Sequence, residues 1–304
     1  MKISIVLCSF NGEKYIKKQL DSIIYQTYQN FELLVFDDGS TDKTIDIVQS
    51  YQKQYQNIKL YQNKKQLGVI KNFEHAITMA NGDLIALSDQ DDIWDKDKLK
   101  VQTSYFLNYS SPLLVYSDMK VIDKNDNLIY NSFFKFKGYN IHNFNTIISR
   151  GGIMGNTIMF NKELKNLIIP FYDDIPMHDY YIGVVAIIYG KTIKLDKKLI
   201  KYRLHNSNIG NKKKSLKEKL KDFCNLPYKD RINFLLYIYK NIDNLSQKHK
   251  IKKFLNTLEY DSLLELCIGV KNHYFKDKIF YHIKLIFRFL LCKMLFQPFQ
   301  KSYK

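Results

Sequence analysis

The first 88 residues alternate between short apolar runs and longer segments with helical spacing. Strands are expected at residues 3–7, 31–36, 58–61 and 84–87, and helices at 13–26, 42–51 and 69–80. Strands separated by single helices are joined by right-handed crossovers, which makes the sheet mainly parallel. The pattern therefore predicts an α/β, Rossmann-like sheet flanked by helices, in which ligands bind beyond the carboxyl ends of the strands.

Polar clusters follow three of these strands at the predicted binding edge. Ser9–Gly12 is either a simple strand-to-helix turn or a nucleotide contact through Ser9 and Asn11. In the second cluster Gly39 permits a turn and Ser40 or Thr41 caps the next helix. That cap does not require two consecutive carboxylates, so Asp37 or Asp38 is a candidate acceptor for the imide N–H of uracil or thymine.

The third cluster, Ser88–Asp92, places three carboxylates in four positions directly after an apolar strand. Unpaired charge beside the apolar side chains of Leu87 and Ile93 is costly, and a divalent cation relieves that cost. Such a cation, Mg2+ or Mn2+, usually completes its shell with substrate phosphates. This cluster predicts a metal site that serves a phosphorylated ligand.

Composition and the remaining motifs narrow the class of protein. A chain of 304 residues with 45% hydrophobic and 14% aromatic residues is folded rather than disordered. It contains no Gly-x-Gly-x-x-Gly or P-loop pattern, and its four cysteines are too few for a disulfide framework. Lys71 is either solvated or close to a phosphate. Met1-Lys2 leads straight into a core strand without a signal peptide, so we expect a cytoplasmic protein.

The positive charge belongs to the C-terminal part of the chain. Residues 210–304 hold 21 of the 47 basic and 8 of the 30 acidic residues, a net of +13 out of +17. We therefore expect a basic helical region over 211–304. Apolar residues at helical spacing in 278–297, with a basic rim, indicate an amphipathic helix that either lies on an anionic membrane surface or packs on the first domain.

The ordered set of motifs resembles the family 2 glycosyltransferases of the GT-A fold, which are inverting enzymes that use nucleotide sugars. The segments that carry the resemblance are Cys8–Asn11, Asp37–Ser40, Gly82-Asp83 and Ser88–Trp94. The resemblance covers about residues 1–205. It implies a GT-A domain over 1–210, with a nucleotide-sugar half at about 1–110 and an acceptor half at about 111–210.

Carried over to this chain, the resemblance makes Asp37 or Asp38 the base-recognising residue and Asp89-Gln90-Asp91 the Asp-x-Asp motif. Asp91 would hold the cation, while Asp89 would reach the ribose or the metal's water shell. Asp92 would contact a sugar or cap the helix expected near Lys96.

The same resemblance extends to two later segments. Met177–Tyr181 is similar to the family site that supplies the catalytic base, which makes Asp179 the candidate base and places His178 in the acceptor pocket or on the surface. Tyr202–His205 is similar to the segment that closes over the diphosphate. There Arg203 would bind phosphate, and His205 would bind the metal or phosphate.

Within the family the chain looks most like the bacterial rhamnosyltransferases and related enzymes that build surface polysaccharides such as O-antigen and capsule, because that branch typically carries Ser-Asp-Gln-Asp-Asp. This resemblance favours dTDP-rhamnose as donor, with UDP-hexose or UDP-N-acetylhexosamine possible, and a glycan or lipid-linked glycan as acceptor. The enzyme would then be peripheral on the inner face of the cell membrane. The alternatives are a GT-A-like nucleotidyltransferase, a non-catalytic relative, or a basic nucleic-acid-binding protein, although no nucleic-acid recognition motif occurs and we expect no nucleic-acid partner.

Overall fold

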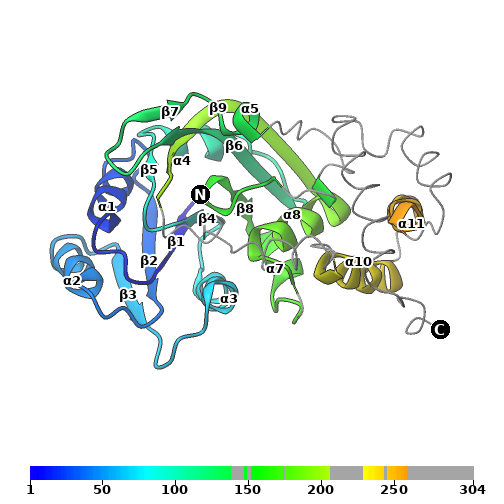
Figure 1. The fold of residues 1–304 in the computed structure, drawn as a ribbon, viewed down its shortest axis with the longest axis horizontal. Coiled ribbons are helices and arrows are strands. Elements are labelled where there is room, and N and C mark those ends of the chain that lie inside the picture. The colour runs from blue at the N-terminus through cyan, green and yellow to red at the C-terminus, as the bar shows by residue number, and fades with distance from the viewer. Residues whose placement is uncertain (138–146, 149–151, 174, 206–228, 243–244, 259–304) are drawn as a thin grey trace, which may run out of the picture. The chain divides into compact units, whose positions relative to one another are not determined.

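The structure, a computed structural model, describes residues 1–137, 147–148, 152–173, 175–205, 229–242 and 245–258 (Figure 1). The chain divides into two compact units. The first comprises Met1–Phe171 with Met177–Asn208, and the second comprises Tyr172–Pro176 with Ile209–Lys304.

The N-terminal half of the first unit is a parallel βα repeat. Strands β1 (Ile3–Ser9), β2 (Phe31–Asp37), β3 (Ile58–Gln62) and β4 (Leu84–Ser88) pair in the order β3-β2-β1-β4. Helices α1 (Ile16–Ile24), α2 (Thr44–Gln54) and α3 (Val69–Met79) connect them. The four strands are parallel and each is joined to the next by one helix, as the alternating pattern predicted.

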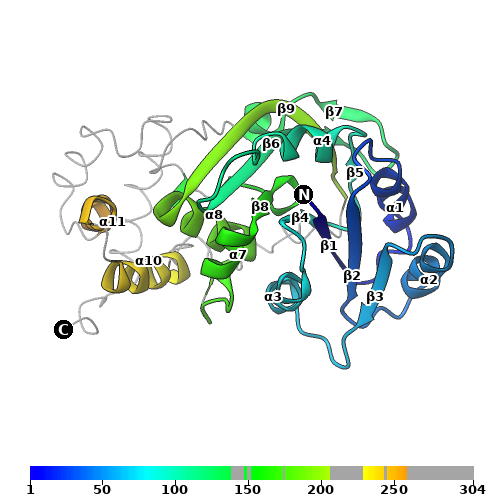
Figure 2. The same cartoon turned by 180° about the vertical axis from the view of Figure 1, so that it is seen from behind.

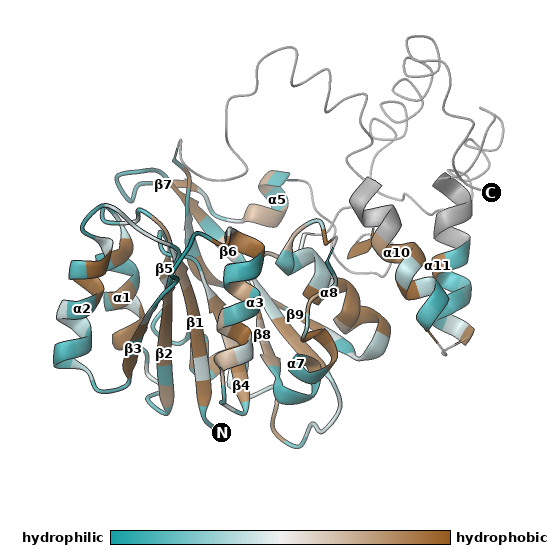
Figure 3. Ribbon diagram, turned by 90° about the horizontal axis from the view of Figure 1, so that it is seen from below, coloured by the Kyte–Doolittle hydropathy of each residue, from teal (hydrophilic) through white to brown (hydrophobic). Residues whose placement is uncertain are grey.

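The direction of each crossover decides where the helices lie. The chain moves outward from β1 to β2 to β3 and then returns past β1 to β4. Right-handed crossovers therefore put α1 and α2 on one face and α3 on the other, as Figures 1 and 2 show. With both faces covered, β1, β2 and β4 are almost wholly buried, and the apolar residues of these strands form the core seen in Figure 3. The order reverses between β1 and β4, which is where such sheets bind ligands.

The second half of this unit extends the sheet with strands of both directions. It contains β5 (Ile93–Trp94), α4 (Lys98–Thr103), β6 (Leu113–Ile122), β7 (Leu128–Tyr130), α5 (Phe133–Lys137), the 3-10 turn η1 (Gly155–Thr157), β8 (Met159–Asn161), α7 (Lys162–Ile168), α8 (His178–Tyr189) and β9 (Lys191–Arg203). The sheet continues β4-β8-β6-β9-β5, and β7 pairs with β6. Strand β8 is antiparallel to β4 and β6, and β5 is antiparallel to β9, while β6 and β9 are parallel. The first half of the sheet is therefore wholly parallel and the second half is mixed.

One strand differs from its prediction in length. The apolar residues at 191–195 and 199–202 predict two short strands separated by the polar residues at 196–197, but β9 is continuous across them. Its register against β6 shifts where Leu195 pairs with Ser117 and Lys198 pairs with Asp118. The residues between are accommodated as a bulge, so the polar segment at 196–197 does not end the strand.

The second unit is described only in part. It contains α10 (Lys229–Asn241) and α11 (Leu245–Leu258). The ring of Tyr172 stacks on that of Tyr237 with centroids 4.2 Å apart. Among the helices that the structure describes, none combines the length and apolar composition needed to cross a bilayer. The amphipathic helix predicted at 278–297 lies outside the described residues.

Candidate active site

The two carboxylates after β2 have different surroundings. Asp37 is fully buried and accepts four hydrogen bonds, from the hydroxyls of Ser9 (2.8 Å) and Ser40 (2.6 Å) and from the backbone N–H groups of Gly39 (3.1 Å) and Ser40 (2.8 Å). A carboxylate offers about four acceptor positions, so these donors occupy all of them. Asp37 therefore stabilises the turn at Gly39-Ser40, and the Ser9 hydroxyl is used as a hydrogen-bond donor to Asp37.

Asp38 retains acceptor capacity. Its Oδ1 accepts from Asn63 Nδ2 (2.9 Å) and from the N–H of Leu67 (2.8 Å), and among the described residues its Oδ2 accepts only from the N–H of Gly68 (2.8 Å). Gly68 has φ +80°, a conformation that favours glycine. Of the two carboxylates that the sequence left open, Asp38 is the one that can accept an additional N–H.

The loop after β1 is tied to both neighbouring clusters. Asn11, at φ +48°, accepts from the N–H of Thr41 (2.8 Å). The amide of Gln90 accepts from the N–H of Phe10 (2.9 Å) and donates to its carbonyl (3.0 Å). A Cβ on Gly12 would lie 2.1 Å from Gln90 Oε1, so this approach requires glycine. Asn11 and Gln90 thus hold the three strand-end clusters together.

The Asp-x-Asp residues concentrate negative charge. Burial, followed by repulsion from Asp91 and Asp179, raises the pKa of Asp89 to about 7. Asp91 Oδ2 lies 2.8 Å from His205 Nε2. His205 is also packed against Tyr15, with ring centroids 5.0 Å apart. Residues from three distant parts of the chain therefore converge on one spot that favours a cation.

Asp92 has an internal role. It is buried and accepts from Asn156 Nδ2 and from the N–H of Arg203 (3.1 Å). Burial and repulsion from Asp91 and Asp89 raise the pKa of this carboxyl well above its usual range. Of the two alternatives for Asp92, the helix cap is excluded, because that helix begins later, with Asp97 as its N-cap residue. Asp92 instead joins the acidic loop to η1 and β9.

The candidate base is in the first turn of α8. Asp179 is close enough to Asp89 to raise its pKa, although 90 positions separate them in the numbering. The preceding His178 is buried and stacks on Phe73 at 3.9 Å between centroids. Neither ring nitrogen of His178 has a hydrogen-bond partner within the described part of the chain, and burial lowers its pKa. A Cβ on Gly155 would lie 2.9 Å from His178 Nε2, so glycine there permits this close packing.

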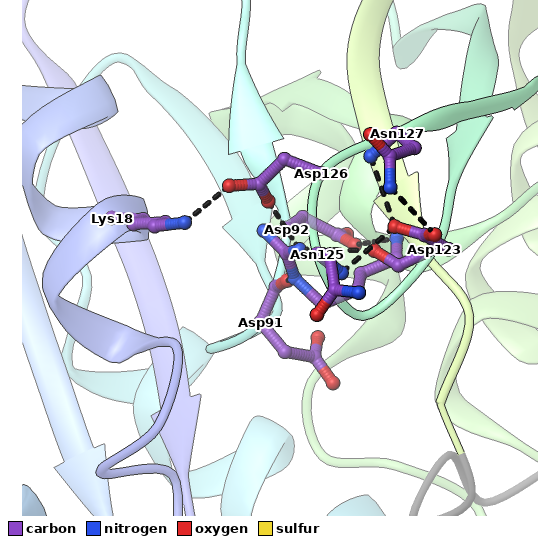
Figure 4. A network of polar contacts seen from close by, with 8 residues as sticks. Lys18, Asp91, Asp92, Asp123, Asn125, Asp126 and Asn127 are labelled. Carbon is purple, nitrogen blue, oxygen red and sulfur yellow. Dashed lines mark hydrogen bonds and ion pairs between the residues drawn. The ribbon is translucent and has the colours of Figure 1, made fainter.

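Arg203 is wholly buried at the centre of a polar network. Its Nε donates to the carbonyl of Asp91 (2.8 Å), its Nη1 donates to the carbonyl of Asp123 (3.2 Å) and pairs with Asp126, and its guanidinium lies 4.6 Å from the ring centroid of Tyr15. Asp126 also pairs with Lys18 of α1, as Figure 4 shows. In this structure the Arg203 guanidinium orients the Asp91 loop.

Lys71 is in the first turn of α3. Its Nζ forms an ion pair with Glu74 (2.8 Å), and its side chain is about half exposed. This exposure agrees with the solvated alternative.

The donor set fits a cation that arrives with a diphosphate. Within the residues that the structure describes, no three His, Cys, Asp or Glu side chains cluster closely enough to hold a metal ion. Asp91 and His205 supply two donor atoms 2.8 Å apart, beside the charge of Asp89. Mg2+ sites commonly use one or two carboxylates, several waters and substrate phosphates, so two protein donors suffice.

Sequence reasoning missed several residues of the site. Asn63, Asp126 and Tyr15 contact predicted residues, and Lys18 pairs with Asp126. Asn63 follows β3, so the strand-end rule that found the other clusters would have found it too. For the others no local signal exists, because each partner is distant in the sequence.

An α/β sheet with polar clusters at the point where its strand order reverses is typical of enzymes that bind nucleotides. Residues 4–167 match the family described as "Glycosyl transferase family 2". The chain belongs to this family and is a glycosyltransferase.

Relatives and solved structures agree with this assignment. The Escherichia coli protein named "UDP-Glc:alpha-D-GlcNAc-diphosphoundecaprenol beta-1,3-glucosyltransferase WfgD" is 33% identical over 241 residues, which cover 77% of this chain and 90% of that protein. The structure of S. aureus TarS 1-349 in complex with UDP-GlcNAc superposes with a TM-score of 0.62 at 23% identity, covering 84% of this chain and 70% of that one. The mannosyltransferase PcManGT from Pyrobaculum calidifontis, in complex with GDP-Man and Mn2+, gives 0.55 at 15% identity over 99% and 88% of the two chains. The GT-A fold predicted from the sequence is confirmed.

Proposed function

We propose that this glycosyltransferase is an inverting, metal-dependent enzyme that moves a sugar from a pyrimidine nucleoside diphosphate to a hydroxyl of a lipid-linked surface glycan. The observation that carries the proposal is the convergence of Asp38, with one open acceptor position, and the Asp89, Asp91 and His205 cluster at one sheet edge.

Asp38 suits uracil and thymine equally, because both bases present an imide N–H. The resemblance to the family branch that carries Ser-Asp-Gln-Asp-Asp favours dTDP-rhamnose. The names of the E. coli relative and the S. aureus structure instead contain UDP-Glc and UDP-GlcNAc. We therefore place UDP-hexose or UDP-N-acetylhexosamine first and keep dTDP-rhamnose as the alternative donor.

The chemistry divides between two sides of the sugar. Asp179 accepts the proton of the acceptor hydroxyl while the hydroxyl oxygen forms a bond to the anomeric carbon of the donor sugar. The bond from that carbon to the diphosphate breaks on the opposite face of the sugar. Asp91 and His205 would hold the divalent metal, and Arg203 keeps the Asp91 loop in place. When bound, the metal neutralises the charge that develops on the leaving phosphate.

The ligand test is thermal stabilisation by UDP, dTDP, GDP and CMP, each with and without Mn2+. A ligand at a hundredfold its dissociation constant adds about 2.7 kcal/mol to stability. We expect a Mn2+-dependent shift with UDP or dTDP and none with GDP or CMP. The absence of a shift with every nucleotide would refute the donor assignment.

The catalytic test compares Asp91→Asn and Asp179→Asn with Asp196→Asn, a change at an exposed β9 position. Asp91→Asn should abolish transfer and weaken Mn2+-dependent nucleotide binding. Asp179→Asn should keep donor binding and lose about 10²- to 10⁴-fold in transfer rate. The control should behave as the parent enzyme. Release of pyrophosphate from a nucleoside triphosphate in the presence of a sugar phosphate, with no nucleoside diphosphate released from a nucleotide sugar, would indicate nucleotidyl transfer.

A further inference from the structure

Exposed apolar side chains gather along β7 and α5, outside the site described above. Leu128, Ile129 and Tyr130 of β7 are 58%, 42% and 42% exposed, and Phe136 of α5 is 38% exposed. Exposed apolar residues on soluble proteins are normally scattered singly, whereas these four fall within residues 128–136. They are termed the β7–α5 patch.

The patch lies at the edge of the sheet. The rings of Tyr130 and Phe136 stack with centroids 4.1 Å apart. Leu128 shares a strand face with Tyr130, since alternate residues point to the same side. Within the described residues β7 pairs with β6 alone, and all three of its residues are exposed, so this edge of the sheet can meet a partner.

The charges around the patch favour an anionic partner. Residues 120–137 contain four lysines, Lys120, Lys124, Lys135 and Lys137. The Nζ of Lys137 lies 5.2 Å from the ring centroid of Phe136. The only carboxylates in this segment, Asp123 and Asp126, are engaged within the turn and with Lys18 and Arg203. A second copy of the chain would bring the same positive charges, which repel each other.

The patch is also joined to the active site by a single turn. Residues 123–127 connect β6 to β7, and Asp126 in this turn pairs with Arg203. Arg203 in turn donates to the carbonyl of Asp91 at 2.8 Å. A partner that binds β7 would therefore lie close to the Asp-x-Asp loop.

We propose that the β7–α5 patch is a docking surface for an anionic lipid bilayer. Its apolar side chains enter the boundary between headgroups and acyl chains, and its lysines contact lipid phosphates. The proposal rests on the proposed function only in taking a lipid-linked acceptor as the reason for membrane contact. It is distinct from membrane binding by the C-terminal region.

The test uses the full chain and its single tryptophan, Trp94, which is buried at 4% exposure and gives a constant background. Leu128→Trp places an indole on the patch, and the control Leu167→Trp places one at a 46% exposed position on α7. Each variant is mixed with vesicles of phosphatidylcholine containing about one third phosphatidylglycerol. Brominated acyl chains in these vesicles quench an indole that enters them.

We expect emission from Leu128→Trp to shift to shorter wavelength and to be quenched, with neither change for Leu167→Trp. Binding should weaken in high salt, where charges are screened within about 3 Å at 1 M. Replacing Lys135 or Lys137 by Gln should lower vesicle partitioning by about fivefold each, which corresponds to about 1 kcal/mol per basic side chain.

Three results would overturn the proposal. The first is an unquenched Leu128→Trp indole in a protein that sediments with vesicles, which would assign binding to another region. The second is equal binding to pure phosphatidylcholine. The third is a lipid-independent shift that grows with protein concentration, which would indicate a second copy on the patch. Nucleotide-induced thermal shifts measured without vesicles depend only on the proposed function, so the two failures are distinguishable.

Discussion

Lys98 of α4 is a buried cation that should make stability depend on pH. Its side chain is fully buried, its Nζ donates to Gln102 Oε1 (2.8 Å), and the ammonium lies 4.0 Å from the ring centroid of Trp94. Burial lowers the pKa of Lys98 from 10.5 to about 7. Between these two values the unfolded chain binds more protons than the folded one, so the free energy of unfolding rises with pH.

The size of this effect follows from the two pKa values. At pH 7 the folded lysine is half protonated, and at pH 9 it is almost wholly neutral, while the unfolded lysine stays charged at both. The linkage relation then gives an increase of about 2 kcal/mol in the free energy of unfolding from pH 7 to pH 9. Lys98→Met keeps most of the side-chain volume and removes the titrating group, so it should remove this increase.

Urea unfolding followed by the emission of Trp94 measures the effect in the unit that carries Lys98. Both proteins are unfolded at pH 7 and pH 9, and the pH-induced change in Lys98→Met is subtracted from that in the parent enzyme. All other titrating groups are common to the two proteins and cancel. A difference near zero would refute the reasoning and mean that Lys98 keeps its charge at no cost in the folded protein.

Three further predictions concern the site. Asp126→Asn removes a charged partner of Arg203 and should weaken Mn2+-dependent nucleotide binding by about tenfold, the equivalent of about 1.4 kcal/mol, as read from Mn2+ titrations. Gly155→Ala places a Cβ 2.9 Å from His178 Nε2. Transfer should fall by about 10²-fold while the UDP thermal shift persists, and loss of both would mean that the damage reaches the donor site. Asp38→Asn sets an amide N–H₂ against backbone donors and should abolish stabilisation by UDP and dTDP; retained stabilisation would exclude Asp38 from base recognition.

Much of the first half of the fold could be predicted from the sequence. Strands β1 to β4 are short apolar runs, and their helices have the 3.6-residue period, so local pattern and tertiary structure agree there. Because carboxyl ends of parallel strands meet at one edge, the clusters at Ser9, Asp37 and Ser88 were also expected to be neighbours.

The second half of the fold was harder to predict from the sequence. The mixed direction of β8, β6 and β9 depends on pairing between segments far apart in the chain. The polar residues at 196–197 read as the end of a strand, yet pairing with β6 carries β9 across them. Hydrogen bonds from β9 to β6 and β5 outweigh the weak local preference of residues 196–197 for ending the strand.

The sequence by itself determined the α/β class, the family and the set of carboxylates available for chemistry, because these depend on periodicity and on the order of motifs. Only the tertiary structure decided which carboxylate keeps an acceptor position unoccupied by the described residues. Asp37 and Asp38 are adjacent and chemically identical, but four donors fill the first and three leave a position open on the second. Acceptor capacity depends on partners that folding brings from elsewhere in the chain, and no local pattern records them.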